Sequence, residues 1–110
     1  MDMLSHTDGI PLSRKLEEAI AEKIGRVEQY APRALRARVH VRKVSARAGR
    51  GQYMVKVLIE LPGKDESATQ TGGSAIEALD IVAEKIEHRL QVRKTRRIAG
   101  RHRGIDRKEF

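Results

Sequence analysis

The sequence contains no cysteine and no tryptophan, and aromatic residues make up only 3% of it. The absence of cysteine excludes disulfides and thiolate metal sites, and it favours a cytoplasmic protein. With so few aromatics, aliphatic side chains must fill the core, and few rings are available to stack on unpaired bases. No apolar run approaches the ~18 residues that a membrane span needs, and the first residues lack the basic-then-apolar order of a signal peptide.

Catalytic and cofactor motifs are missing as well. There is no nucleophile elbow, paired-acid motif or P-loop, so we predict that the chain is not an enzyme and takes no small-molecule substrate or cofactor. The four histidines show no metal-ligand spacing along the chain, and we therefore predict no metal site. They are His6, His40, His88 and His102.

Positive charge is what the chain has in excess. Its 23 lysines and arginines outnumber 15 aspartates and glutamates, for a net charge of +8. Such a balance favours nucleic acid or an anionic membrane surface as a partner. A length of 110 residues with 39% hydrophobic residues suits one domain with a modest core. We expect a soluble, monomeric domain that faces RNA or DNA.

The first third of the chain predicts a strand and a helix. Residues 2–7 form a short strand with poor alternation, and Asp8-Gly9 turns the chain. The helix that follows is capped by Ser13 and ended by Pro32. Its apolar stripe separates a basic flank from an acidic one. The stripe consists of Leu16, Ala19, Ile20, Ile24, Val27 and Tyr30.

Two strands with period-two alternation come next. In residues 35–42 apolar side chains alternate with basic ones, and the inward set is Leu35, Ala37, Val39 and Val41. Residues 48–51 predict a hairpin connection to a second strand, residues 52–61. After the Pro62-Gly63 turn, the polar residues 64–71 predict only a weakly buried strand at a sheet edge.

Residues 72–97 hold the clearest helix pattern. Gly72-Gly73 marks a turn, and Ser74 with Glu77 forms a capping box. The following apolar residues recur at helical spacing as Ala75, Leu79, Val82, Ala83, Ile86 and Leu90. The flanks of this stripe again differ in sign, with Lys85, Arg89 and Arg96 on one side and Asp80, Glu84 and Glu87 on the other.

These elements predict an α+β fold of order β-α-β-β-β-α, with a four-stranded mixed sheet and two parallel helices packed on one face. The domain covers residues 1–97, and residues 98–110 are predicted to form a basic disordered tail. Because both apolar stripes face the sheet, one helix turns its basic flank and the other its acidic flank into the groove between them. The remaining basic flank then forms an outer edge.

Over residues 5–94 this pattern resembles the ribosome hibernation factors, also known as the ribosome-associated inhibitor or sigma-54 modulation family. The resemblance is carried by Leu12-Ser13, Leu16, Lys23-Ile24, Arg26-Val27, Tyr30, Ala78-Leu79-Asp80, Lys85-Ile86-Glu87 and Leu90. The chain departs from the family at Ser74-Ala75-Ile76, where Asp-Met-Tyr is usual, and at His88, where a basic residue often stands. Its length implies the short, single-domain branch.

The resemblance implies a stress or stationary-phase factor that binds the small ribosomal subunit and the 70S ribosome. The family's site lies in the channel between head and platform, where it overlaps messenger RNA and transfer RNA. We predict that the phosphates of 16S rRNA are contacted by Lys23, Arg26, Lys85, Arg89, Arg93, Lys94, Arg96 and Arg97. A secondary basic face is predicted at Arg36, Arg38 and Arg42.

Each assignment has a simpler alternative. Lys23 lies near the apolar stripe and is equally compatible with a lysine that extends its stem along the core. Lys85 and Arg89 are compatible with ion pairs to carboxylates of the neighbouring helix, and the secondary face with plain solvation. Two other functions also fit the pattern. One is a general double-stranded RNA-binding module, which shares a sheet with two parallel helices, and the other is a regulatory domain that binds a protein partner.

Overall fold

The computed structural model describes the backbone of residues 1–45 and 52–109, and the side chains of residues 1–44 and 52–95. Its elements are β1 (Asp2–Asp8), α1 (Arg14–Gly25), a 3-10 turn η1 (Arg26–Gln29), β2 (Arg36–Ser45), β3 (Gln52–Glu60), β4 (Glu66–Gly72) and α2 (Ala75–Glu109). The predicted order is confirmed. The connection at residues 48–51 lies outside the described residues.

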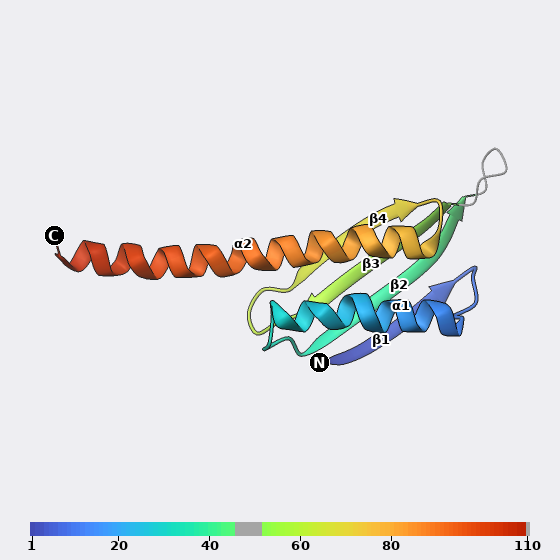
Figure 1. The fold of residues 1–110 in the computed structure, drawn as a ribbon, viewed down its shortest axis with the longest axis horizontal. Coiled ribbons are helices and arrows are strands. Elements are labelled where there is room, and N and C mark those ends of the chain that lie inside the picture. The colour runs from blue at the N-terminus through green and yellow to red at the C-terminus, as the bar shows by residue number, and fades with distance from the viewer. Residues whose placement is uncertain (46–51, 110) are drawn as a thin grey trace.

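The four strands form one mixed sheet in the order β1-β2-β3-β4. β1 pairs with β2 in parallel, and the other two pairings are antiparallel. Both helices cover the same face of the sheet and run in the same direction (Figure 1). This is the arrangement that a crossover through α1 requires, and the predicted fold class is confirmed.

Both helices begin at the predicted serines. The Ser13 hydroxyl accepts a hydrogen bond from the backbone N–H of Leu16 at 3.2 Å. The Ser74 hydroxyl accepts one from the backbone N–H of Glu77 at 3.1 Å. Each cap satisfies an N–H group that has no partner within its own helix. The backbone at Gly72 passes close to the first turn of α2, because a Cβ on Gly72 would lie 3.1 Å from the Ala78 nitrogen. A larger residue at position 72 would therefore have to displace the start of α2 by a few tenths of an ångström.

The core is aliphatic, as the composition predicts. Alternate side chains of β2 and β3 point toward the helices, and the apolar stripes of α1 and α2 close over them. The largest fully buried side chains are Ile20, Ile24, Ile59, Leu79, Ile86, Val27, Val39, Val41, Val55, Val57 and Val82. Tyr30 packs against this cluster while remaining partly exposed.

One predicted core residue is wrong. Leu35 is 61% exposed, although the alternation placed it beside Ala37 on the inner face. It precedes β2, and the backbone N–H of Leu35 donates to the Glu60 carbonyl at 2.8 Å. The small side chains of Ala31 and Ala34 are buried at this end of the molecule instead. The alternation therefore holds only from the first residue of the strand.

α2 extends further than predicted. Its 35 residues run to Glu109, whereas the sequence predicts an end near Arg97. The second half of the helix passes beyond the edge of the sheet (Figure 1). The side chains of Arg96 and Arg97 lie outside the described residues, and the division of the chain at residue 97 stays a prediction.

Candidate nucleic-acid interface

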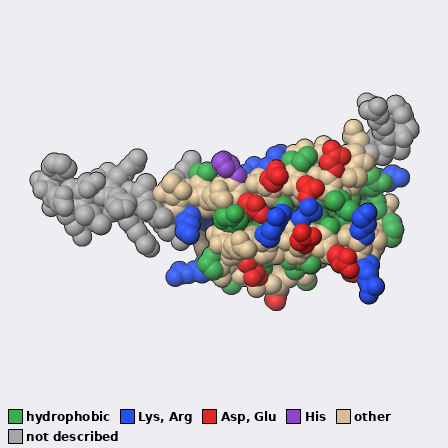
Figure 2. Space-filling model, viewed as in Figure 1, with side chains coloured by type: hydrophobic (Ala, Val, Ile, Leu, Met, Phe, Trp, Pro, Cys, Tyr) green, Lys and Arg blue, Asp and Glu red, His purple; other side chains and the backbone are tan. Residues whose placement is uncertain are grey.

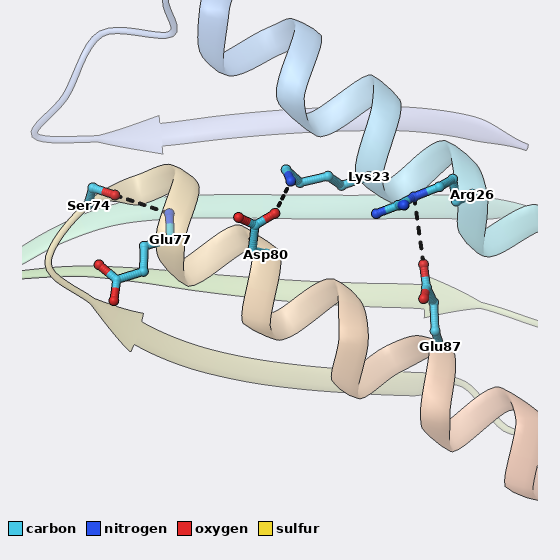
Figure 3. Close-up of polar contacts among 6 residues, drawn as sticks. All are labelled: Lys23, Arg26, Ser74, Glu77, Asp80 and Glu87. Carbon is cyan, nitrogen blue, oxygen red and sulfur yellow. Dashed lines mark hydrogen bonds and ion pairs between the residues drawn. The ribbon is translucent and has the colours of Figure 1, made fainter.

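The groove between the helices contains ion pairs, as the segregated flanks predict. Lys23 of α1 pairs with Asp80 of α2, and one turn later Arg26 approaches Glu87 with 4.0 Å between Nε and Oε1 (Figure 3). The face that carries the helices accordingly shows acidic and basic side chains side by side (Figure 2). The groove is mixed in sign.

Lys23 and Arg26 differ in their exposure and in how closely they approach the carboxylate of their pair. The Lys23 side chain is only 19% exposed and has its ammonium on the Asp80 carboxylate, so its stem packs against neighbours while its charge is compensated. Arg26 is 56% exposed, and 4.0 Å is beyond hydrogen-bond reach of Glu87. Of the two, Arg26 is the more available to an external anion.

The opposite flank of α2 reaches across β4. Lys85 donates to the side-chain oxygen of Gln70, Arg89 to the backbone carbonyl of Ser67, and Arg93 to the carbonyl of Lys64 at 2.6 Å. We name Lys85, Arg89 and Arg93 the β4-side flank. The alternative pairing of Lys85 and Arg89 with carboxylates of α1 is excluded, because these side chains extend away from the groove.

The hydrogen-bond partners of the β4-side flank are neutral oxygens. A hydrogen bond to an amide or carbonyl oxygen orients a cation without cancelling its charge. Only Arg93 also lies near a carboxylate, with 3.7 Å between Nη1 and Oε2 of Glu66. This separation is short enough for an ion pair but too long for a hydrogen bond. Within the described part of the chain, Arg93 Nη1 is buried and has no hydrogen-bond partner. The flank therefore presents two uncompensated cations, Lys85 and Arg89, roughly 6 Å apart along the helix, and Arg93 continues the row with its charge partly compensated by Glu66.

The basic surface continues around the end of the sheet. A pocket of about 320 Å³ is lined by the side chains of Arg93 and Lys94 together with Tyr30 and Arg33. Arg33 was not predicted as a site residue, because it lies alone in a loop between Pro32 and Ala34 with no periodicity to mark it. Its proximity to Arg93 depends on how α2 crosses the end of η1, which the sequence does not encode locally.

The predicted secondary basic face lies on the side of the sheet without helices. There Arg36 and Arg38 share one carboxylate, with their Nε atoms 3.9 and 3.1 Å from the two oxygens of Glu60. Arg42 is exposed on the same face. Because a single acidic side chain compensates two of the three arginines in part, this face carries less free positive charge than the β4-side flank. Its assignment to RNA stays a prediction.

Two histidines meet on this open face. The parallel register pairs His6 of β1 with His40 of β2, and both rings lie against the Asp8 carboxylate. The hydrogen bond from His40 lowers the pKa of Asp8 below its usual value. Spacing along the chain missed this cluster, since His6 and His40 are brought together only by the pairing of two strands that a helix separates.

Residues 5–98 match the family model described as sigma 54 modulation protein / S30EA ribosomal protein. The chain belongs to this ribosome-associated family. The match covers most of the sequence and confirms the resemblance predicted over residues 5–94.

Solved structures agree on the fold. The chain is similar to the N-terminal domain of Thermus thermophilus Protein Y, with 14% identity, a TM-score of 0.71, and coverage of 82% of this chain and 96% of that one. It is also similar to a ribosomal subunit interface protein from Coxiella burnetii, with 18% identity, a TM-score of 0.75, and coverage of 86% and 99%. Comparison with curated proteins finds no match. Among the described residues no helix is long and apolar enough to cross a membrane.

Proposed function

We propose that this chain is a cytoplasmic hibernation factor that silences translation by binding the small ribosomal subunit through phosphates of 16S rRNA. Membership of a ribosome-associated family supports the partner. The observation that carries the mode of binding is the β4-side flank, where Lys85 and Arg89, one helical turn apart, are oriented by neutral oxygens alone. Arg93 continues the row beside Glu66. Orientation without neutralisation is what a phosphate-binding surface requires, because the cation has lost rotational freedom but keeps its charge.

The physical character of the surface favours recognition of the RNA backbone. The described side chains of the flank are cationic and long, and the aromatic residues that stack on unpaired bases are scarce in the whole sequence. Lys94 and Arg33 extend the same surface around the pocket at the end of the sheet. Binding through such contacts releases counterions and therefore weakens steeply as salt rises.

In the mechanism that we propose, the domain occupies the channel between head and platform of the small subunit. It binds as a monomer, on idle 70S ribosomes under stress or in stationary phase. Occupation of the channel excludes messenger RNA and transfer RNA, and no chemical step is needed. The phosphate contacts hold the domain in place, while its aliphatic core keeps the flank rigid.

The test is co-sedimentation with purified subunits and 70S ribosomes over a salt series, in the presence of a competing RNA duplex of ~16 base pairs, the length that a double-stranded RNA-binding domain spans. We expect retention on the small subunit despite the competitor, with steep loss as salt rises. Migration with the duplex would identify a general double-stranded RNA-binding module. Binding to neither would favour a protein partner.

The matched variants reverse two charges at different places on the helices. Lys85→Glu with Arg89→Glu changes the β4-side flank, whereas Arg14→Glu with Lys15→Glu makes the same change at the exposed start of α1. We expect the first pair to abolish ribosome association and the second to retain most of it. Equal losses would show that net charge alone drives binding, and would contradict the assignment of this flank.

A further inference from the structure

The open face of the sheet holds a compact group of ligand atoms that the proposed function does not use. His6 and His40 are paired residues of the parallel strands β1 and β2, so their side chains leave the sheet on the same side. Their rings are 5.0 Å apart between centroids and inclined by 49°. Asp8, two residues after His6, returns to this same face.

The carboxylate of Asp8 joins the two rings. One oxygen lies 3.3 Å from Nε2 of His6, and the other lies 2.7 Å from Nε2 of His40. Each residue offers one ligand atom, and these atoms all lie within 4.8 Å of one another. Two of the three side chains are well exposed, at 70% for His6 and 52% for Asp8, while His40 is 37% exposed. The group is open to an ion from solution.

We propose that His6, Asp8 and His40 form a binding site for a divalent transition-metal ion, with Zn²⁺ as the ion that their chemistry fits. Ligands at ~2.0–2.1 Å around a tetrahedral ion lie about 3.3 Å from one another. The His6–Asp8 pair already has this separation at 3.3 Å, and the His40–Asp8 pair, now hydrogen-bonded at 2.7 Å, must open slightly to admit the ion. Imidazole nitrogen with a single carboxylate selects zinc and its first-row neighbours over magnesium or calcium. The exposed side of the site leaves room for water to complete the coordination.

Binding requires only a local change. With Nε2 of both rings facing the ion, each imidazole carries its proton on Nδ1, and the direct hydrogen bonds to Asp8 are replaced by bonds to the metal. The surrounding cations set a limit on affinity, because Arg42 is the strand partner of Asp8 and Lys56 is the strand partner of His40. We therefore expect an exchangeable site rather than a permanent structural one.

The site has a structural consequence. β1 lies at the edge of the sheet and pairs with β2 alone. An ion held by two residues of β1 and one of β2 ties the edge strand to its neighbour, and above its Kd it stabilises the folded state by an amount that grows with the logarithm of the free ion concentration. This face is distinct from the β4-side flank, so the metal site and the ribosome-binding proposal can be tested independently of each other.

The test is a titration of the full chain, produced without an affinity tag, with Zn²⁺ by calorimetry and with Co²⁺ by visible absorption. We expect one ion per chain and the intense visible bands of Co²⁺ in low-symmetry nitrogen and oxygen coordination. His6→Ala and His40→Ala should each weaken binding by more than the roughly tenfold that loss of an outer-shell partner costs. Asp8→Asn should weaken it as well.

The matched control is His88→Ala, which removes an exposed histidine from α2. It should leave both titrations unchanged, and the melting temperature of the wild type should rise with Zn²⁺ while that of His6→Ala does not. His6 is 70% exposed, so its removal leaves the core intact, and circular dichroism without metal checks this. No saturable binding, or equal binding by His6→Ala, His40→Ala and His88→Ala, would overturn the proposal.

Discussion

The two flanks of α2 differ in whether their charged side chains are paired with opposite charges. On the groove side, the acidic residues Asp80 and Glu87 meet Lys23 and Arg26 of the neighbouring helix. On the β4 side, Lys85 and Arg89 meet only neutral oxygens of the strand. The same helix thus uses one flank to join the two helices and leaves the other flank with its positive charge available. Counting lysines and arginines does not show which of them keep their charge available. The groups that each side chain contacts do show this.

The largest expected effect is on the β4 side. Lys85→Glu with Arg89→Glu should abolish ribosome association, and each single change to alanine should lower the slope of log affinity against log salt by about 1, because one phosphate contact is lost. The free energy of unfolding should change by less than about 0.5 kcal/mol for each alanine variant, since exposed surface substitutions rarely cost more. Salt-dependent co-sedimentation and thermal melts measure the two quantities. A single variant with an unchanged salt slope would remove that residue from the proposed interface.

A smaller effect, on stability, is expected on the groove side. Asp80→Ala leaves the ammonium of Lys23, whose side chain is only 19% exposed, without its carboxylate, which should cost about 1 kcal/mol of unfolding free energy. For a domain of this size that lowers the melting temperature by about 4 °C. Differential scanning calorimetry at low and high salt measures it. Asp80→Asn is the control, because it removes the charge and keeps a hydrogen-bond acceptor. An undiminished melting temperature in Asp80→Ala would show that solvent already screens this pair.

The start of α2 contributes at a similar scale to the stability of both flanks. Ser74→Ala removes the hydroxyl that accepts from the N–H of Glu77 and should cost about 1 kcal/mol, whereas Ser74→Asp should retain the cap. Ribosome affinity should follow stability only weakly, because the β4-side flank begins three turns later. Thermal melts of the two variants, compared under one buffer, decide whether the cap acts as described. Equal melting temperatures for Ser74→Ala and Ser74→Asp would contradict it.

Most of the fold could be predicted from the sequence because its signals are local. Ser13 and Ser74 precede helical periodicity, and Val39 and Val41 alternate with basic residues, so caps, stripes and inward faces follow from nearest neighbours along the chain. Leu35 was assigned wrongly because alternation does not say where a strand begins. The end of α2 was predicted too early because residues 98–110 lack an apolar stripe, the pattern on which the helix prediction rested. A helical segment that extends past the sheet has no core to pack against and needs no such stripe.

The candidate site could be predicted only in part. The mixed sign of the groove follows from the topology together with the charges on each stripe, and Lys23–Asp80 confirms it. The neutral acceptors of Lys85 and Arg89 could not be predicted from the sequence, because they depend on how α2 packs over β4. The pairing of His6 with His40 needed the register of two parallel strands, which spacing along the chain does not contain.

The smallest expected effect separates Lys23 from the β4-side flank. Both were predicted to bind phosphate, yet Lys23 already has a carboxylate partner while Lys85 does not. Lys23→Met keeps most of the apolar stem and frees Asp80, which is 48% exposed and regains water easily. Unfolding free energy should therefore change by less than about 0.5 kcal/mol. The salt slope of ribosome binding should fall by clearly less than the change of about 1 expected for Lys85→Ala. Measured side by side with Lys85→Met, an equal loss of slope would show that Lys23 leaves Asp80 to bind RNA, and the groove would then belong to the interface.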